Sequence, residues 1–423
     1  MEKILTKNVG VENSHSIDVY EKGGGYRSLR KAEREMTPVA VTAEVKKSGL
    51  RGRGGAGFPT GLKWSFMPQD KTRPHYLLNN ADESEPGTFK DRVLMEHDPF
   101  AVVESMAIEA FAVGANKAYL YVRGEYPIAG ERMARAIDQA RAAGLLGADI
   151  LGSALAFDIE LRRGAGAYIC GEETALFESI EGKRGEPRNK PPFPVEVGLF
   201  GKPTAVNNVE TLANVLLVLA GGPEGDGVGG GEAFATIGTE GSTGPKLFCL
   251  SGHVARPGVY EVEFGATLRD LIELAGGVPG GRAIQTILLG GAAGVFVGGE
   301  ALDTPLTFEA TRAIGATLGS GVVMVFDETA DLVDTLRRIA RFFRDESCGQ
   351  CVPCRVGTVR QEELLARLAA AQGGPARARS REAELELLRE IGQAMRDASI
   401  CGLGQTASSA IESVLKRPGM VAL

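Results

Sequence analysis

The sequence predicts a multidomain protein in which an α/β domain is followed by a small α+β module and a C-terminal bundle of four helices. Three observations predict this order. The 423 residues exceed the roughly 100–200 residues of one domain. Apolar residues at 43% and charged residues at 24% are typical of globular proteins and exclude disorder over most of the chain. The hydrophobic periodicity also changes twice, after residue 235 and after residue 326.

Charge and hydropathy exclude two classes of partner. Lys and Arg number 47 against 54 Asp and Glu, for a net charge of −7, so the chain has no overall cationic field for nucleic acid. The most apolar stretch, residues 209–220, is shorter than the roughly 20 residues of a membrane-spanning helix. Because the polar N-terminus lacks the apolar region of a signal peptide, we expect a cytoplasmic protein with reduced cysteines.

The chain begins with a polar segment, residues 1–36, that contains three consecutive glycines. It predicts an arm that packs on another surface. Thr37 and Pro38 are typical of the N-cap and the first position of a helix, which we expect to end at Gly49.

Residues 37–235 form the predicted α/β domain. Strand-like apolar runs at 76–78 and 118–122 alternate with helical stretches at 101–114 and 131–143. Such alternation predicts a mainly parallel sheet with helices on its faces.

A glycine-rich segment at 221–231 predicts a loop or linker near the end of this domain. Residues 246–326 contain short β-branched segments around one helical segment, 267–275, and predict the small α+β module. Strand signals are absent from residues 330–423. This last part instead has four amphipathic stripes, which predict the helix bundle and lie at 332–343, 361–371, 382–396 and 407–416.

Four of the six cysteines have the spacing of a metal-cluster site. The C-x2-C-x2-C pattern followed by a remote fourth cysteine suits a [4Fe–4S] cluster, whereas zinc usually takes two separated pairs. The spacing alone does not exclude a zinc site or cysteines that only pack in the core. The four residues are Cys348, Cys351, Cys354 and Cys401. Cys170 and Cys249 stand alone in apolar surroundings and are interpreted as small buried hydrophobes.

A glycine-rich loop follows the first predicted helix of the α/β domain. Gly52, Gly54 and Gly57 formally satisfy the dinucleotide fingerprint, but a helix precedes them where that motif requires a strand. Positions without side chains still allow backbone N–H groups to approach a flat or anionic ligand. Arg51, Arg53 and Lys63 would be its charge partners. A phosphate- or flavin-binding loop is one interpretation, and a tight solvent loop is the other.

Three further segments carry polar side chains that suit a nucleotide. The first follows the strand ending at Leu78, at the edge of the sheet where ligands usually bind. The second has an acidic pair at a helix start, where a carboxylate is as often a cap as a ligand. The chain has no H-E-x-x-H, P-loop or G-x-S-x-G motif, and hydrolytic chemistry is disfavoured. The candidate residues are Asn79, Asn80, Asp82, Glu83, Glu85, Glu172, Glu173, Lys190, Phe193, Asn207, Asn208 and Thr211.

Taken together, these segments resemble the FMN- and NADH-binding 51 kDa flavoprotein family of respiratory NADH-quinone oxidoreductase (complex I). The resemblance spans nearly the whole chain after Thr37. Its motifs are GLRGRGGAGFPTGLKW at 49–64, NADESEPGTFKDR at 80–92, GAGAYICGEETAL at 164–176, KPPFP at 190–194, NNVETL at 207–212 and ESCGQCVPCR at 346–355. It implies a Rossmann-like layout for the α/β domain and a β-grasp fold of the soluble-ligand-binding type for residues 246–326.

The resemblance also implies a role for each matching residue. Those at positions that hold FMN are Gly52, Gly54, Lys63, Asn80, Asp82, Gly171, Glu172, Glu173, Asn207 and Asn208. Those at positions that receive NADH are Phe58, Phe66, Glu85, Lys190 and Phe193. The implied ligands of the [4Fe–4S] cluster are Cys348, Cys351, Cys354 and Cys401.

The implied activity is hydride transfer from NADH to FMN, then single-electron transfer to the cluster and on towards quinone, with no catalytic acid or base from the chain. The implied partners are a [2Fe–2S] thioredoxin-like subunit and a larger iron–sulfur subunit, which would hold the chain at the cytoplasmic side of the membrane. Glu85 and Glu173 would repel the 2′-phosphate of NADPH. The segment around Cys401 also resembles the flavoprotein subunits of soluble NAD-linked hydrogenases and formate dehydrogenases. An electron-relay protein without flavin is a third alternative.

Overall fold

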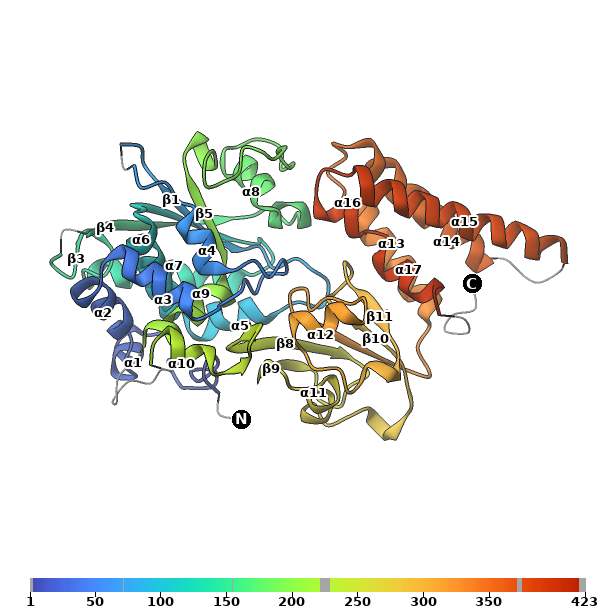
Figure 1. The fold of residues 1–423 in the computed structure, drawn as a ribbon, viewed down its shortest axis with the longest axis horizontal. Coiled ribbons are helices and arrows are strands. Elements are labelled where there is room, and N and C mark those ends of the chain that lie inside the picture. The colour runs from blue at the N-terminus through green and yellow to red at the C-terminus, as the bar shows by residue number, and fades with distance from the viewer. Residues whose placement is uncertain (1–2, 71, 154, 221–228, 371–374, 418–423) are drawn as a thin grey trace.

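The computed structural model describes residues 3–70, 72–153, 155–220, 229–370 and 375–417. An α/β part with the N-terminal helices lies on one side of the molecule, a second sheet lies next to it, and the C-terminal helices form a lobe of their own (Figure 1). The predicted multidomain fold is therefore confirmed. Of the predicted glycine-rich linker, residues 221–228 lie outside the described residues.

The first sheet is mainly parallel, as predicted. Its strands are ordered β3 (Gly147–Ile150), β4 (Leu155–Arg163), β2 (Lys117–Val122), β1 (Tyr76–Ala81) and β5 (Thr204–Asn208). All neighbours pair in parallel except β3 and β4. Because alternate strand residues face opposite sides, this sheet contacts two separate hydrophobic clusters.

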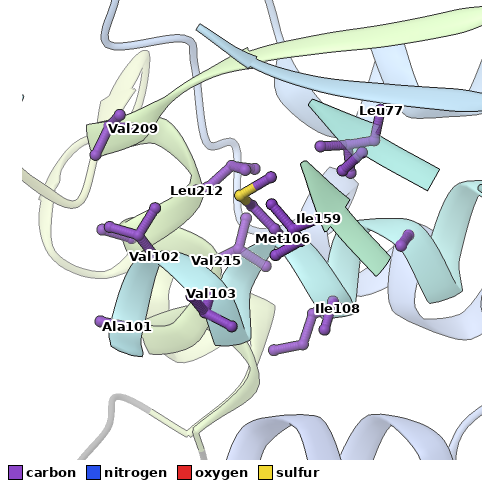
Figure 2. Packing of buried hydrophobic residues seen from close by; sticks show 14 of the residues in the cluster. Leu77, Ala101, Val102, Val103, Met106, Ile108, Ile159, Val209, Leu212 and Val215 are labelled. Atoms are coloured by element: carbon purple, nitrogen blue, oxygen red, sulfur yellow. The ribbon is translucent and has the colours of Figure 1, made fainter. Parts of the chain in front are cut away.

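One face of the first sheet is covered by helices. The helices that contact its strands are α6 (Pro99–Val113), α7 (Pro127–Ala142) and α9 (Val209–Leu219), and α3 (Pro38–Lys47) and α5 (Lys90–His97) pack on these helices. Figure 2 shows α6 and α9 packed together through Val102, Met106, Leu212 and Val215, next to Leu77 and Ile159 of the sheet. The predicted helix start at Thr37 is confirmed, since its side chain accepts a hydrogen bond of 3.2 Å from the backbone N–H of Ala40.

The N-terminal arm packs on the α/β part of its own chain. It contains α1 (Ile17–Lys22) and α2 (Arg27–Glu35). The buried carboxylate of Glu104 on α6 accepts hydrogen bonds from the Tyr20 hydroxyl at 2.6 Å and from the backbone N–H groups of Tyr26 and Leu29 at 2.7 and 3.0 Å. A carboxylate at a helix N-terminus satisfies N–H groups that have no partner within the helix. Glu104 therefore fastens α2 to the core.

The second sheet is mixed. Its order is β11 (Val295–Val297), β10 (Ile284–Leu289), β12 (Val322–Asp327), β8 (Pro245–Gly252) and β9 (Gly258–Glu263), with β12 and β8 parallel and the other pairs antiparallel. Its own hydrophobic cluster includes residues of α11. The predicted helical segment at 267–275 is this helix, α11 (Leu268–Leu274), which begins with a capping box.

The C-terminal lobe is helical. Each of the four predicted stripes falls in or overlaps a helix of this lobe. The structure adds a fifth, short helix, α16. The five helices are α13 (Leu332–Glu346), α14 (Val352–Ala370), α15 (Pro375–Ala398), α16 (Gly402–Thr406) and α17 (Ser409–Leu415). The expected start of the second helix at Gln361 was wrong, because α14 begins at Val352. Its first turns bury small and polar residues, Gly357 and Thr358, and expose Val356, so their buried face has no apolar stripe.

Shorter elements connect these parts. They are α4 (Thr60–Ser65), α8 (Glu173–Ile180), α10 (Gly231–Ala235), α12 (Phe308–Ala313), β6 (Gly238–Thr239), β7 (Ser242–Thr243) and 3-10 turns at Tyr168–Gly171, Leu199–Gly201, Pro279–Gly281 and Gly299–Ala301. Among the described residues, no helix is both long and apolar enough to cross a membrane.

Candidate functional site

A cavity of about 520 Å³ lies where the three parts of the chain meet, within the roughly 300–1,000 Å³ of small-molecule sites. Loops that connect strands of the second sheet contribute Gly290, Ala293, Thr317, Gly319 and Ser320 to its wall, and the helical lobe contributes Gly402, Leu403 and Thr406. The remaining wall comes from the α/β part. Seven of the predicted cofactor residues line it: Gly54, Asn80, Asp82, Glu85, Gly171, Glu172 and Asn208.

The loop after β1 brings polar groups into this cavity. The side-chain amide of Asn80 donates to the backbone carbonyl of Gly171 at 2.8 Å, and its oxygen accepts from the backbone N–H of Asp82 at 3.1 Å. Asp82 Oδ1 accepts from the Ser84 hydroxyl at 2.8 Å, but Asp82 Oδ2 is buried and has no hydrogen-bond partner among the residues that the structure describes. Burial raises the pKa of Asp82 to about 7. A buried acceptor without a partner destabilises a site, so this cavity suits a ligand with hydrogen-bond donors.

The glycine-rich loop forms another side of the cavity. Its backbone closes through a 2.9 Å hydrogen bond from the N–H of Gly52 to the carbonyl of Phe58. A Cβ at Gly54 would lie 3.0 Å from Cβ of Asn208, so glycine allows the loop to approach the end of β5. The residues therefore fit a flat cofactor such as FMN, held between this loop and the loop after β1.

Two of the expected charge partners of that loop have another role. Arg53 is fully buried and donates through Nη2 to the carbonyls of Thr243 and Pro245 at 2.7 and 3.1 Å. Arg51 donates to Glu309 at 2.7 Å. The interpretation that both arginines face a ligand was wrong. They fasten the glycine-rich loop to the second sheet and its preceding segment.

Charged side chains from three segments form a network next to the cavity. Nζ of Lys190 lies 2.9 Å from Glu172 Oε1 and 2.7 Å from Glu173 Oε1, and Nζ of Lys63 lies 3.5 Å from Glu173 Oε2. Burial acts to raise the pKa of Glu173, but Lys63 and Lys190 outweigh it and lower the pKa. Glu172 also caps α8, since its carboxylate accepts from the backbone N–H groups of Thr174 and Ala175. Glu172 is therefore a helix cap and also one of the predicted site residues.

The three predicted aromatic residues are exposed rather than packed in the core. Phe58, Phe66 and Phe193 have exposed fractions of 46%, 52% and 53%. The ring centroids of Phe58 and Phe66 are 6.3 Å apart. Exposed aromatic rings are available for stacking on a base, as the resemblance implies for NADH. None of the three lines the cavity.

Asn207 does not reach the cavity. It lies beside Asn79 in the sheet register, and its amide donates to the buried Glu109 carboxylate of α6. Neighbouring residues of a strand face opposite sides, so Asn207 and Asn208 cannot share the same ligand through their side chains. Gly52, Lys63, Glu173 and Lys190 are also absent from the wall.

Because Glu109 is buried, its pKa is raised from 4.5 to about 8. At pH values between these two pKa values, Glu109 is protonated in the folded chain and ionised in the unfolded chain. The free energy of unfolding therefore falls as the pH rises through this range. Each pKa unit corresponds to about 1.4 kcal/mol. We expect Glu109→Gln to change the free energy of unfolding little at pH 5 and to increase it at pH 8. Urea unfolding at both pH values measures this. The exposed Glu131→Gln is the control, and an equal effect of Glu109→Gln at both pH values would contradict the expectation.

The sequence did not identify Tyr168 as a site residue. Its hydroxyl donates to Glu85 Oε2 at 2.6 Å, and the backbone N–H of Ala293 donates to Glu85 Oε1 at 3.0 Å. The Tyr168 ring packs on Phe342 of α13 with centroids 5.0 Å apart. A Cβ at Gly291, where φ is +81°, would lie 2.4 Å from Glu85. Glu85 is thus held between the second sheet and a residue that contacts the helical lobe.

A buried group of charges adjoins the cavity, whose wall includes Lys90 and Asp91. Glu210 Oε2 is 2.8 Å from Nζ of Lys90 and 3.4 Å from Nζ of Lys246, and Lys90 also pairs with Asp91 at 2.8 Å. Asp91 accepts a 2.6 Å hydrogen bond from the Asn208 amide. Burial acts to lower the pKa of Lys90, but Asp91 and Glu210 raise it. These ion pairs join α5 and α9 to β8.

The four predicted cluster ligands converge in the helical lobe. Cys354 is buried in the first turn of α14, and Cys348, Cys351 and Cys401 pack against the same hydrophobic cluster. Burial raises the pKa of Cys354 to about 11, and Cys351, Cys401 and Cys348 act in the same direction. Within the described residues, no three His, Cys, Asp or Glu side chains are placed to share one metal ion. Three cysteines at C-x2-C-x2-C spacing with a fourth from another segment are a donor set that fits [4Fe–4S] better than zinc, which usually takes two separated pairs.

The cluster ligands and the cavity are adjacent. Cys401 is the N-cap of α16, and the next two residues, Gly402 and Leu403, belong to the cavity wall. An electron on a cofactor in this cavity would therefore be close to a ligand of the cluster.

Comparisons with known proteins agree with this organisation. Residues 45–217 match the Nuo51 FMN-binding domain, residues 247–292 match the SLBB domain, and residues 334–417 match the NADH-ubiquinone oxidoreductase-F iron–sulfur binding region. The F 2 subunit of the NADH-quinone oxidoreductase of Rhizobium meliloti (strain 1021) is 46% identical over 98% of this chain and 95% of the relative. The HndC subunit of the NADP-reducing hydrogenase of Solidesulfovibrio fructosivorans is 44% identical over 98% of this chain and 81% of the relative.

A solved structure shares the fold. The NAD+-reducing [NiFe]-hydrogenase in its H2-reduced state has a TM-score of 0.82 and 38% identity, over 98% of this chain and 65% of the hydrogenase chain. The chain belongs to the F-subunit family of NADH-quinone oxidoreductase and carries the FMN-binding domain and the iron–sulfur binding region of that family.

Proposed function

We propose that this chain oxidises NADH at a bound FMN and passes the electrons one at a time to a [4Fe–4S] cluster held by Cys348, Cys351, Cys354 and Cys401. The observation that carries the proposal is the shared wall: Gly402, next to Cys401, lines the same cavity as Gly54, Asn80 and Asp82. FMN suits this task because a flavin accepts two electrons together and releases them singly.

The chain's own residues position the reactants in this proposal. Asn80, Asp82 and Asn208 offer hydrogen bonds to FMN within the cavity, while Gly54 keeps the backbone close. The exposed rings of Phe58, Phe66 and Phe193 stack on NADH, and Glu85 and Lys190 orient it. No side chain supplies or removes a proton, so catalysis rests on orientation.

Glu173 sets the preference for NADH in this account, because its carboxylate would repel a ribose 2′-phosphate. We expect Glu173→Ala to raise the ratio of kcat/KM for NADPH to that for NADH by about ten-fold, the size of a ~1.4 kcal/mol change. Removing Glu173 also leaves Lys63 and Lys190 without this partner. Steady-state kinetics with both nucleotides measure the ratio. Glu186→Ala is the matched control, and an unchanged ratio in Glu173→Ala would remove this role from Glu173.

We place the chain in a multi-subunit complex, with a [2Fe–2S] thioredoxin-like subunit and a larger iron–sulfur subunit as partners and quinone as the final acceptor. It would meet the cytoplasmic side of the membrane only through those partners.

The hydrogenase relatives favour a second candidate, in which the same chain is the flavoprotein subunit of a soluble NAD-linked hydrogenase or formate dehydrogenase. Purification of the tagged chain with its partners separates the two: membrane-bound quinone-reductase subunits support the first, and a nickel or molybdenum subunit supports the second.

Reconstitution tests the activity itself. The full chain is loaded with iron, sulfide and FMN, and NADH oxidation is followed with ferricyanide as the acceptor. We expect a flavin absorption band and NADH-dependent reduction of ferricyanide. A chain that shows the cluster signal but binds no flavin would instead be an electron-relay protein.

A further inference from the structure

A serine hydroxyl contacts one of the four predicted cluster cysteines. Oγ of Ser347 lies 3.2 Å from Sγ of Cys354. The same oxygen accepts a hydrogen bond of 3.3 Å from the backbone N–H of Gly349, so the hydroxyl hydrogen is available for the sulfur. A cysteine that ligates iron does so as a thiolate, which has no hydrogen to donate. Ser347 is therefore the donor of this pair when Cys354 is a cluster ligand.

The backbone around Ser347 fixes the place of its hydroxyl. Ser347 is the C-cap of α13, and its N–H donates to the carbonyl of Phe343 at 3.1 Å. Gly349 has a φ of +79°, a left-handed conformation that glycine adopts without strain, and this turn brings its N–H back to Ser347. The preceding residue, Glu346, accepts a 2.9 Å hydrogen bond from the backbone N–H of Tyr168, which lines the cavity. The segment that carries the hydroxyl is thus tied both to α13 and to the cavity wall.

The sulfur that the hydroxyl contacts is shielded from water. Cys354 is only 5% exposed and belongs to the hydrophobic cluster of the lobe. A hydrogen bond in such surroundings is electrostatically stronger than one in water. Among the described residues, no other side chain forms a hydrogen bond with the sulfur of any of the four cysteines. Negative charge on Cys354 is therefore stabilised by the Ser347 hydroxyl rather than by solvent.

We propose that the Ser347 hydroxyl donates a hydrogen bond to the Cys354 thiolate of the [4Fe–4S] cluster and thereby raises the reduction potential of this cluster. The inference deepens the proposed function and rests on it, since the cluster is the one that accepts electrons from the flavin. On reduction the cluster gains one electron from the flavin, and no bond forms or breaks. A hydrogen bond to a more negative acceptor is stronger, so this bond stabilises the reduced cluster more than the oxidised one. Hydrogen bonds to the sulfurs are among the factors that set the potential of such clusters.

The test uses the full chain reconstituted with iron, sulfide and FMN. We expect Ser347→Ala to keep its iron content and to lower the midpoint potential of the cluster. At a fixed potential the ratio of reduced to oxidised cluster should fall about ten-fold, which corresponds to about 59 mV for a one-electron couple. Ser347→Thr retains a hydroxyl and should keep the potential of the unmodified chain. A redox titration followed by electron paramagnetic resonance measures the ratio, and iron analysis measures the cluster content.

Ser413→Ala is the matched control for loss of a hydroxyl in the same lobe. The Ser413 hydroxyl donates to the carbonyl of Ala410 at 2.6 Å and accepts from the backbone N–H of Phe296 at 2.8 Å, and its removal should leave the potential unchanged.

An unchanged or higher potential in Ser347→Ala would overturn the inference, as would an equal fall in Ser413→Ala or in Ser347→Thr. Failure of Ser347→Ala to assemble a cluster would also overturn it, because a hydrogen bond that only tunes the potential is not needed for ligation. An unmodified chain that assembles no cluster would count against the proposed function instead.

Discussion

Replacing Glu210 with alanine is expected to lower the free energy of unfolding by about 3–5 kcal/mol, the cost of leaving a buried charge without its partner. Glu210 is fully buried and pairs with Lys90 and Lys246 at 2.8 and 3.4 Å. It also accepts a 2.8 Å hydrogen bond from the backbone N–H of Leu247. Its removal leaves two buried ammonium groups short of negative charge and weakens the connection between the two sheets.

Urea unfolding of the full chain measures this effect. Glu300→Ala is a matched control, because Glu300 makes a surface ion pair with Arg417 at 2.5 Å, and exposed pairs contribute at most about 1 kcal/mol. Equal destabilisation by Glu210→Ala and Glu300→Ala would show that the buried group does not hold the sheets together.

Replacing Cys401 with alanine is expected to remove the [4Fe–4S] cluster while FMN still binds. An alanine cannot ligate iron, and the other three ligands come from one short segment. Cys401 adjoins the cavity wall, but its side chain is not part of it. Iron analysis and electron paramagnetic resonance of the reduced protein measure the cluster, and flavin absorption measures FMN.

Cys170→Ala provides the comparison for this variant. Cys170 is buried in the hydrophobic cluster that contains Cys354 and against which the other three ligands pack, but its position in sequence and its lone spacing predict a packing role. We expect full iron content in Cys170→Ala. Loss of the cluster in Cys170→Ala, or its retention in Cys401→Ala, would require a different ligand set.

Local sequence patterns predicted the elements well where periodicity and capping agree. Thr37 and Pro38 start α3, and the strand-like runs became β1 and β2. The start of α14 was missed, because its first turns place valines on the exposed face and bury Gly357 and Thr358, so the buried face has no apolar stripe there. The packing of the arm was also beyond local patterns, because it depends on Glu104, which lies far along the chain.

Only the residues that the α/β part contributes to the candidate site could be predicted from the sequence. Asn80, Asp82 and Gly54 belong to local motifs and line the cavity, whereas Gly290, Ser320 and other wall residues come from loops between strands of the second sheet and have no local pattern. Arg53 looked like a ligand group because it stands among glycines. Its guanidinium instead donates to the backbone carbonyls of Thr243 and Pro245. This role depends on tertiary contacts, which the local sequence does not reveal.

The central claim is that the FMN cavity and the four cysteines act as one electron-transfer unit. Rapid freezing of the reconstituted chain after mixing with NADH, followed by electron paramagnetic resonance, tests it most directly. We predict that the reduced-cluster signal develops together with the bleaching of the flavin. A cluster that stays oxidised while the flavin is reduced, yet accepts electrons from dithionite, would contradict the claim.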